Sequence, residues 1–196
     1  MYSIASLLDP ASDQTVHALW ERFEEHCGLT GIKLAPLPHF SWQGADAYHL
    51  DEVEKLLSEQ AGKMEPFIVQ AAGLGMFTGP RPVIYIALVK NETLLRVHKM
   101  LWDCLRPHAQ TPNGYYDPNR WMPHITLAFR EIDPDRLGCA IADIAFRKVE
   151  FKITVDHFAV IYQENGSSGL HSQIVFGNGT LLEGGTSESS SISVCG

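Results

Sequence analysis

One order of predicted elements occurs twice along this chain, and this repetition constrains the fold more than any other feature of the sequence. Each half reads helix, strand, helix, strand, strand, judged from helical spacing, strand alternation and turn residues. In the first half the helices are predicted over Asp13–Cys27 and Leu50–Lys63, and the strands over Lys33–Trp42, Pro66–Ala72 and Pro82–Val89. An extra strand is predicted before them, over Tyr2–Leu8.

The second half repeats this order. Its helices are predicted over Asn91–Pro107 and from Asp133 to about Arg147, and its strands over Met122–Phe129, Val149–Gln163 and Leu170–Phe176. Asp133 and Pro134 form an N-cap and first helical residue. For the first helix, Ser12 or Asp13 is available as N-cap, and Gly28 as the stop. The halves share order rather than letters, so the sequence predicts two copies of one structural plan.

The composition narrows the class of partner. The chain has 196 residues, 45% of them hydrophobic, which is typical of a globular protein with a real core. Its net charge of −8 argues against a protein that holds long nucleic acid across many phosphates. Apolar segments such as Val83–Val89 are too short to span a bilayer. The acidic charge therefore favours a small ligand or contact with only a few nucleotides, and we expect no membrane partner and no long nucleic acid. We also expect a monomer.

The cysteines bear on the cellular compartment. Cys27, Cys104, Cys139 and Cys195 form no C-x-x-C pair and show no zinc-finger spacing. Scattered single cysteines are typical of a reducing compartment, where they act as small apolar residues. The first ten residues contain no export signal. The sequence therefore predicts a cytoplasmic protein.

Two motifs with the same pattern occupy equivalent strands of the two copies. Pro-His-Phe-Ser-Trp contains His39 and Ser41, and Pro-His-Ile-Thr-Leu contains His124 and Thr126. Because side chains alternate along a strand, each histidine shares a face with its hydroxyl residue. One H-x-[ST] match alone is weak. Two matches at equivalent places predict a shared cleft.

This set of side chains suits cleavage of a phosphodiester. Histidine titrates near neutrality, so one ring can act as base while the other, protonated, acts as acid. The hydroxyls of Ser41 and Thr126 can donate to the non-bridging phosphate oxygens. This chemistry needs no metal and no cofactor.

With these motifs the sequence resembles the 2H phosphoesterase superfamily, and most of all its 2′-5′ RNA ligase-like branch. That family is marked by two H-x-[ST]-x motifs, matched here at His39 and His124. Ser41 stands where threonine is usual, which keeps the hydroxyl. The segment GMFTGPRPVIYIAL also resembles the stretch that links the two halves in that branch.

The resemblance reaches to about Phe176 and implies the architecture. It implies a bilobal, duplicated α+β fold with an antiparallel sheet and helices in each lobe, and a central cleft at a pseudo-twofold axis. We predict one such domain over residues 1–177, with the chain exchanging between lobes around residues 80–110. Glycine and serine dominate beyond it, which predicts a flexible tail over residues 178–196.

Further residues are candidates for binding substrate. Arg130 is six residues past His124, so regular alternation would place it on the same face, where it could hold a phosphate. The alternative for Arg130 is solvated surface. Tyr115, Tyr116 and Trp121 lie in the loop before the second motif, and we take Tyr115 and Trp121 as candidates for stacking on a base. The alternative is that these aromatic residues pin a long loop to the core.

Together with the resemblance, these residues predict a metal-independent phosphodiesterase acting on a 2′-5′ linkage or a cyclic phosphate of a small nucleotide or short RNA end. His39 and His124 would share acid and base catalysis, in roles that the sequence leaves interchangeable. Two alternatives stay open: a nucleotide- or RNA-end-binding module of the same fold with little turnover, and an RNA 2′-5′ ligase.

Overall fold

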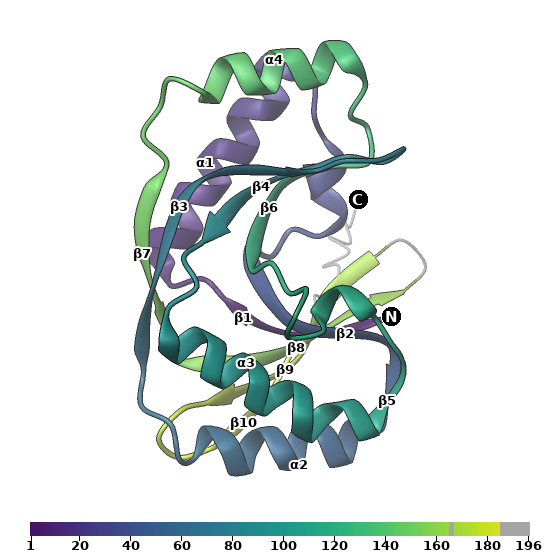
Figure 1. The fold of residues 1–196 in the computed structure, drawn as a ribbon, viewed down its shortest axis with the longest axis vertical. Coiled ribbons are helices and arrows are strands. Elements are labelled where there is room, and N and C mark those ends of the chain that lie inside the picture. Colours follow the sequence, from purple (N-terminus) through teal and green to yellow (C-terminus); the bar gives the residue numbers. More distant parts are fainter. Residues whose placement is uncertain (165–166, 185–196) are drawn as a thin grey trace, which may run out of the picture.

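The computed structural model describes residues 1–164 and 167–184, and within them the strands form two antiparallel sheets (Figure 1). The first sheet runs in the order β10 (Leu181–Glu183), β9 (Ser167–Val175), β8 (His157–Glu164), β1 (Tyr2–Leu7), β2 (His39–Tyr48) and β5 (Ala109–Pro112). The second runs in the order β6 (His124–Phe129), β4 (Val83–Leu88), β3 (Phe67–Phe77) and β7 (Glu150–Val155).

Each sheet has its own pair of helices. α1 (Pro10–Cys27) packs on β6 and β7 of the four-stranded sheet and contacts α4 (Pro134–Ile144). α2 (Leu50–Ala61) and α3 (Glu92–Leu105) pack on the six-stranded sheet, at the opposite end of the molecule (Figure 1). The predicted α+β fold, with an antiparallel sheet and helices in each of two lobes, is confirmed. Among the described residues, no helix has both the length and the apolarity needed to cross a membrane.

The two copies are interleaved rather than set side by side. The chain places β1 and β2 in the six-stranded sheet, β3 and β4 in the other, β5 back in the first, then β6 and β7 in the second, and ends in the first. One of these crossings, from β4 to β5, falls within residues 80–110; the exchange between lobes that we expected there stays a prediction. Because of this interleaving, the two motif strands lie in different sheets and contact each other.

One predicted strand is two strands in the structure. We expected a single strand over Val149–Gln163, but the chain changes sheet at Asp156. β7 before it pairs with β3, and β8 after it pairs with β1 and β9. The alternation of apolar residues shows which residues point inward, but it does not report which sheet supplies the partner strand.

The predicted start of α4 is confirmed, whereas the predicted start of α1 is about one turn too late. Asp133 caps α4 as predicted, its side chain accepting from the Arg136 amide. The cap of α1 is Asp9 followed by Pro10, one turn earlier than the Ser12 or Asp13 that we expected. Gly28 ends α1 in the left-handed conformation, at φ 65°.

Two segments expected to be irregular contain regular structure. The glycine-rich residues after Ala72 extend β3 to Phe77, and the predicted tail begins with β10, which pairs with β9. The tail prediction is therefore wrong for Leu181–Glu183, because unpaired β9 groups at the sheet edge offer a partner that composition does not reveal. Residues 185–196 of the predicted tail, Cys195 among them, lie outside the described residues.

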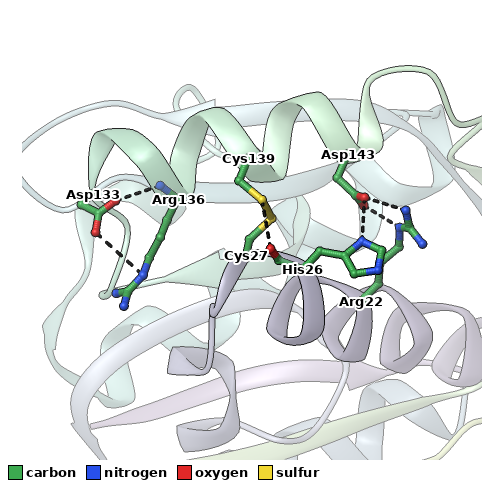
Figure 2. The surroundings of a disulfide bond; sticks show 7 residues. All are labelled: Arg22, His26, Cys27, Asp133, Arg136, Cys139 and Asp143. Carbon is green, nitrogen blue, oxygen red and sulfur yellow. Dashed lines mark hydrogen bonds and ion pairs between the residues drawn. A yellow bond between two sulfur atoms is a disulfide. The ribbon is translucent and has the colours of Figure 1, made fainter.

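Two of the cysteines are paired, contrary to our expectation of free thiols. Cys27, at the end of α1, forms a disulfide with Cys139 on α4, across a separation of 112 residues (Figure 2). Beside it, Asp143 accepts two hydrogen bonds from Arg22, at 2.5 and 2.6 Å, and its Oδ1 lies 3.0 Å from Nδ1 of His26. Arg22 foremost, and then His26, hold the pKa of Asp143 at about 2. The cysteines therefore no longer support a reducing compartment.

Candidate active site

The structure brings both motifs to one cleft. His39 and Ser41 on β2 line it together with His124 and Thr126 on β6. The cavity measures about 200 Å³, below the roughly 300–1,000 Å³ typical of pockets that enclose a whole drug-sized ligand. It can take a phosphate and part of the attached group, while the rest of a substrate lies outside.

The two imidazoles are held in the same way. Nδ1 of His39 lies 2.6 Å from the Leu37 carbonyl oxygen, and Nδ1 of His124 lies 2.7 Å from that of Met122. A carbonyl only accepts, so Nδ1 carries hydrogen in each ring and donates it. Nε2 is then the nitrogen that can take or give a proton.

The prolines of the two motifs have matching backbone contacts. The Pro38 carbonyl accepts from the amide of Leu8, and the Pro123 carbonyl from that of Leu88, both at 3.1 Å. In register, His39 pairs with Leu7 and His124 with Ala87. The pseudo-twofold relation therefore extends from the order of elements to single hydrogen bonds.

Each motif ends in a β-bulge. Ala5 and Ile4 pair with Ser41 and Gln43, which leaves Trp42 extra; Tyr85 and Ile84 pair with Thr126 and Ala128, which leaves Leu127 extra. The extra residue sits in the core in both cases. A bulge bends its strand and changes which later residues face each side. The motif residues consequently keep the expected alternation, whereas the residues after the bulge do not.

A tryptophan indole binds the backbone at each bulge. Nε1 of Trp121 donates to the Ser41 carbonyl, and Nε1 of Trp20 donates to the Thr126 carbonyl, both at 3.1 Å. Trp20 comes from the apolar face of α1, and sequence reasoning gave it no role beyond the core. These bonds hold the backbone of the two hydroxyl residues in place.

Electrostatics separate the two histidines. Burial lowers the pKa of His39, and the charge of His124 lowers it further, while the bond to the Leu37 carbonyl opposes both. Burial also lowers the pKa of His124, against the bond to the Met122 carbonyl. Because each charge disfavours the other, the singly protonated pair is favoured over the doubly protonated one.

Aromatic rings surround His124 on the side of β3 and β4. The ring of Phe77 meets it edge-on at 4.9 Å between centroids, and Tyr85 lies at 5.1 Å. Gly75 makes room for Tyr85, because a Cβ there would lie 2.3 Å from the phenol ring. This packing fixes the orientation of the His124 ring.

Arg130 does not line the cleft. The bulge at Leu127 breaks the alternation on which its placement was predicted, and β6 ends at Phe129. Arg130 itself has a left-handed backbone, at φ 71°, and its guanidinium lies over the Phe129 ring. The predicted position beside His124 is therefore wrong.

The aromatic candidates are placed differently from our expectation. Trp121 is buried, stacked against Trp42 and His98, so it offers no ring face to a base. Tyr115 is 71% exposed and lies outside the cleft, with Arg120 over its ring. Its neighbour Tyr116 lines the cleft instead. The loop was the right one, but only the tertiary contacts separate the two tyrosines.

Metal ligands do not gather in the part of the chain that the structure describes. Among residues 1–164 and 167–184, no three His, Cys, Asp or Glu side chains are placed to hold a metal ion. The expectation of a metal-free reaction stays a prediction.

Comparisons with known proteins give one family model and several relatives. The family model described as "2'-5' RNA ligase superfamily" matches residues 8–167. Two similar proteins share the name "Putative phosphoesterase": one from Bacillus pumilus is 27% identical over 64% of this chain and 70% of its own length, and one from Geobacillus sp. is 25% identical over 90% and 96%. A third of that name, from Geobacillus kaustophilus, is 26% identical over 80% of this chain and 85% of its own.

Proposed function

This chain belongs to the 2′-5′ RNA ligase superfamily of 2H phosphoesterases, and we propose that it is a metal-independent phosphodiesterase. Its substrate is a 2′-5′ linkage or a cyclic phosphate of a small nucleotide or a short RNA end. One observation carries the proposal: two histidines, each with Nδ1 bonded to a carbonyl, line one cleft with two hydroxyl residues.

The reaction needs one base and one acid. Nε2 of the neutral histidine takes a proton from the attacking water as its oxygen bonds to phosphorus. The Nε2 proton of the other, charged histidine goes to the departing ribose oxygen as the P–O bond breaks. The pair starts and ends with the same number of protons, on exchanged rings, and exchange with solvent restores the first state.

The pKa shifts disfavour the doubly protonated pair, in which no base would be present. Both pKa values are lowered by burial, and the charge of His124 lowers that of His39 further. One neutral and one charged ring can then coexist, which predicts a bell-shaped pH profile with its acidic limb below the usual histidine pKa of about 6.5.

The hydroxyls of Ser41 and Thr126 complete the site. Each lies one strand repeat beyond its histidine and lines the same cleft. Donation to the non-bridging oxygens stabilises the charge that grows there in the transition state. A site of this kind holds the phosphate of a diester, which carries one negative charge.

Turnover of a substrate panel tests the proposal. Wild type, His39→Ala, His124→Ala and the double variant are assayed on 2′,3′-cyclic, 3′,5′-cyclic and 2′-5′-linked nucleotides, in EDTA. Each single variant is expected to lose about 10²- to 10⁴-fold in kcat, as is usual for a lost acid or base. His49→Ala, at an exposed residue just before α2 and away from the cleft, is the matched control and retains full activity.

Three results would contradict the proposal. The first is a wild type that turns over none of these diesters, and the second is activity that EDTA abolishes and zinc restores. The third is tight nucleotide binding without product, which would favour a binding module. Analysis of products with two RNA ends present separates hydrolysis from ligation.

A further inference from the structure

The cleft contains a tyrosine that neither motif supplies. Tyr116 belongs to the short 3-10 helix η3 (Gly114–Tyr116), in the connection between β5 and β6. η3 contacts β2, so Tyr116 stands beside the first motif although it precedes the second. The corresponding connection before β2, which contains the short helix η1 (Gly31–Leu34), contacts β6.

These two connections make the cleft asymmetric. The connection that reaches β6 contributes apolar side chains to the cleft, from Ile32, Ala35 and Leu37. The connection that reaches β2 contributes the phenol of Tyr116. The pseudo-twofold axis that relates the motifs therefore does not relate the two connections that line the cleft.

The fold holds the Tyr116 ring firmly. Asn113 caps η3: its side-chain oxygen accepts a hydrogen bond from the backbone N–H of Tyr115 at 3.0 Å. The backbone N–H of Asn113 donates to the Gly44 carbonyl at 2.9 Å. The ring lies over Gly44, where a Cβ would come within 3.0 Å of Cε2. The backbone of Gly44 is not left-handed, so glycine is needed there for space rather than for conformation.

The Tyr116 hydroxyl interacts with Ser41. Burial raises the pKa of Tyr116, and a hydrogen bond with the Ser41 side chain acts against that rise. Either hydroxyl of such a pair can be the donor. Because burial keeps the phenol protonated, Tyr116 can donate to Oγ of Ser41 when the Ser41 proton points to another acceptor. A serine hydroxyl that accepts at one lone pair has fewer directions left in which to donate.

The two motifs differ at this residue. Threonine is β-branched, so the χ1 of Thr126 is restricted by its own methyl group. Ser41 lacks that methyl group, so its hydroxyl rotates more freely about χ1. Where the family pattern has threonine, this chain has serine with a tyrosine hydroxyl beside it.

We propose that Tyr116 is a positioning residue that orients the Ser41 hydroxyl toward the phosphate, taking the place of the missing γ-methyl group. The proposal rests on the proposed function, in which Ser41 binds the phosphate. Tyr116 donates to Oγ of Ser41, and Ser41 donates to a non-bridging oxygen. Bonds linked in this way strengthen each other.

A double-mutant cycle tests this role. Tyr116→Phe is expected to lower kcat/KM roughly 3- to 10-fold, the usual worth of one hydrogen bond. In a Ser41→Ala background the same change has less than about a twofold effect, because its acceptor is gone. In a Ser41→Thr background the loss of kcat/KM is also smaller than in wild type, because the threonine methyl group already restricts the hydroxyl of residue 41. Tyr2→Phe, which removes a hydroxyl bonded to Glu164, is the matched control without effect.

A second measurement keeps the test independent of turnover. The same cycle is repeated for the binding of adenosine 2′-phosphate and adenosine 3′-phosphate by calorimetry, with thermal melting of every variant. Equal losses from Tyr116→Phe in wild type and in the Ser41→Ala background, or no loss in wild type, would overturn the role of Tyr116 alone. A wild type without turnover would overturn the proposed function, and the binding cycle would still decide about Tyr116.

Discussion

Removing the Cys27–Cys139 disulfide is expected to cost several kcal/mol of stability and almost no activity. The bond closes a loop across 112 residues, for which the loop-entropy relation gives about 5 kcal/mol. Measured values commonly fall below that figure, so we expect a loss of about 3–5 kcal/mol in Cys27→Ser/Cys139→Ser. In a chain of this length that lowers Tm by roughly 6–20 °C.

The native contacts around the bond explain why activity survives. Arg22 and His26 on α1 still bind Asp143 on α4 when the disulfide is absent (Figure 2). The two helices therefore stay together, and the loss arises mainly in the unfolded state, which becomes freer.

Guanidinium unfolding with and without dithiothreitol measures this effect. The wild type is expected to lose stability on reduction, and the double variant to be insensitive to it. The control Cys104→Ser, at a described cysteine outside the disulfide, should respond like wild type. Mass spectrometry after alkylation counts the thiols. Equal stability of wild type and double variant in the absence of reductant would refute the reasoning.

Three further changes have defined outcomes. Burial lowers the pKa of His98 to about 4, so between pH 6.5 and 4 the unfolded state binds a proton that the native state does not. The free energy of unfolding should therefore fall by up to about 3 kcal/mol over that window. Urea unfolding should show a smaller fall for His98→Phe, which keeps a ring against Trp121. Gly75→Ala puts a Cβ into the Tyr85 ring that packs on His124, so kcat should fall at least about tenfold, and an unchanged kcat would argue against the role of this packing. Both polar side-chain atoms of Gln43 are buried without a hydrogen-bond partner among the described residues, so Gln43→Leu should raise the free energy of unfolding by about 1–3 kcal/mol; a fall on denaturant titration would mean that the amide has a partner such as buried water.

Local signals predicted most of the elements. The helical spacing in α3 and the Asp-Pro start of α4 gave the correct type and nearly the correct ends, because caps and amphipathic faces depend on neighbours in sequence. The strand across Asp156 was mispredicted, because pairing with β3 or with β1 is a long-range choice. The disulfide was missed for the same reason, since its cysteines meet only when α1 packs on α4.

The site residues likewise include some that local signals predicted correctly and one that they misplaced. Alternation correctly placed His39 with Ser41 and His124 with Thr126 at one cleft, because no irregularity falls inside either triplet. Arg130 was misplaced because a bulge follows, and bulges arise from the fit between two strands rather than from one strand's letters.

The sequence by itself determined the two motifs, the order of elements around them and the face that each motif presents. All of these follow from spacing along the chain, which the 3.6-residue and two-residue periods convert into geometry. Only the tertiary structure decided that the two copies interleave, that Trp20 and Trp121 bind the motif backbones, and that Tyr116 rather than Tyr115 enters the cleft. These contacts join residues far apart in the chain, and their energies depend on how whole sheets and helices pack against one another.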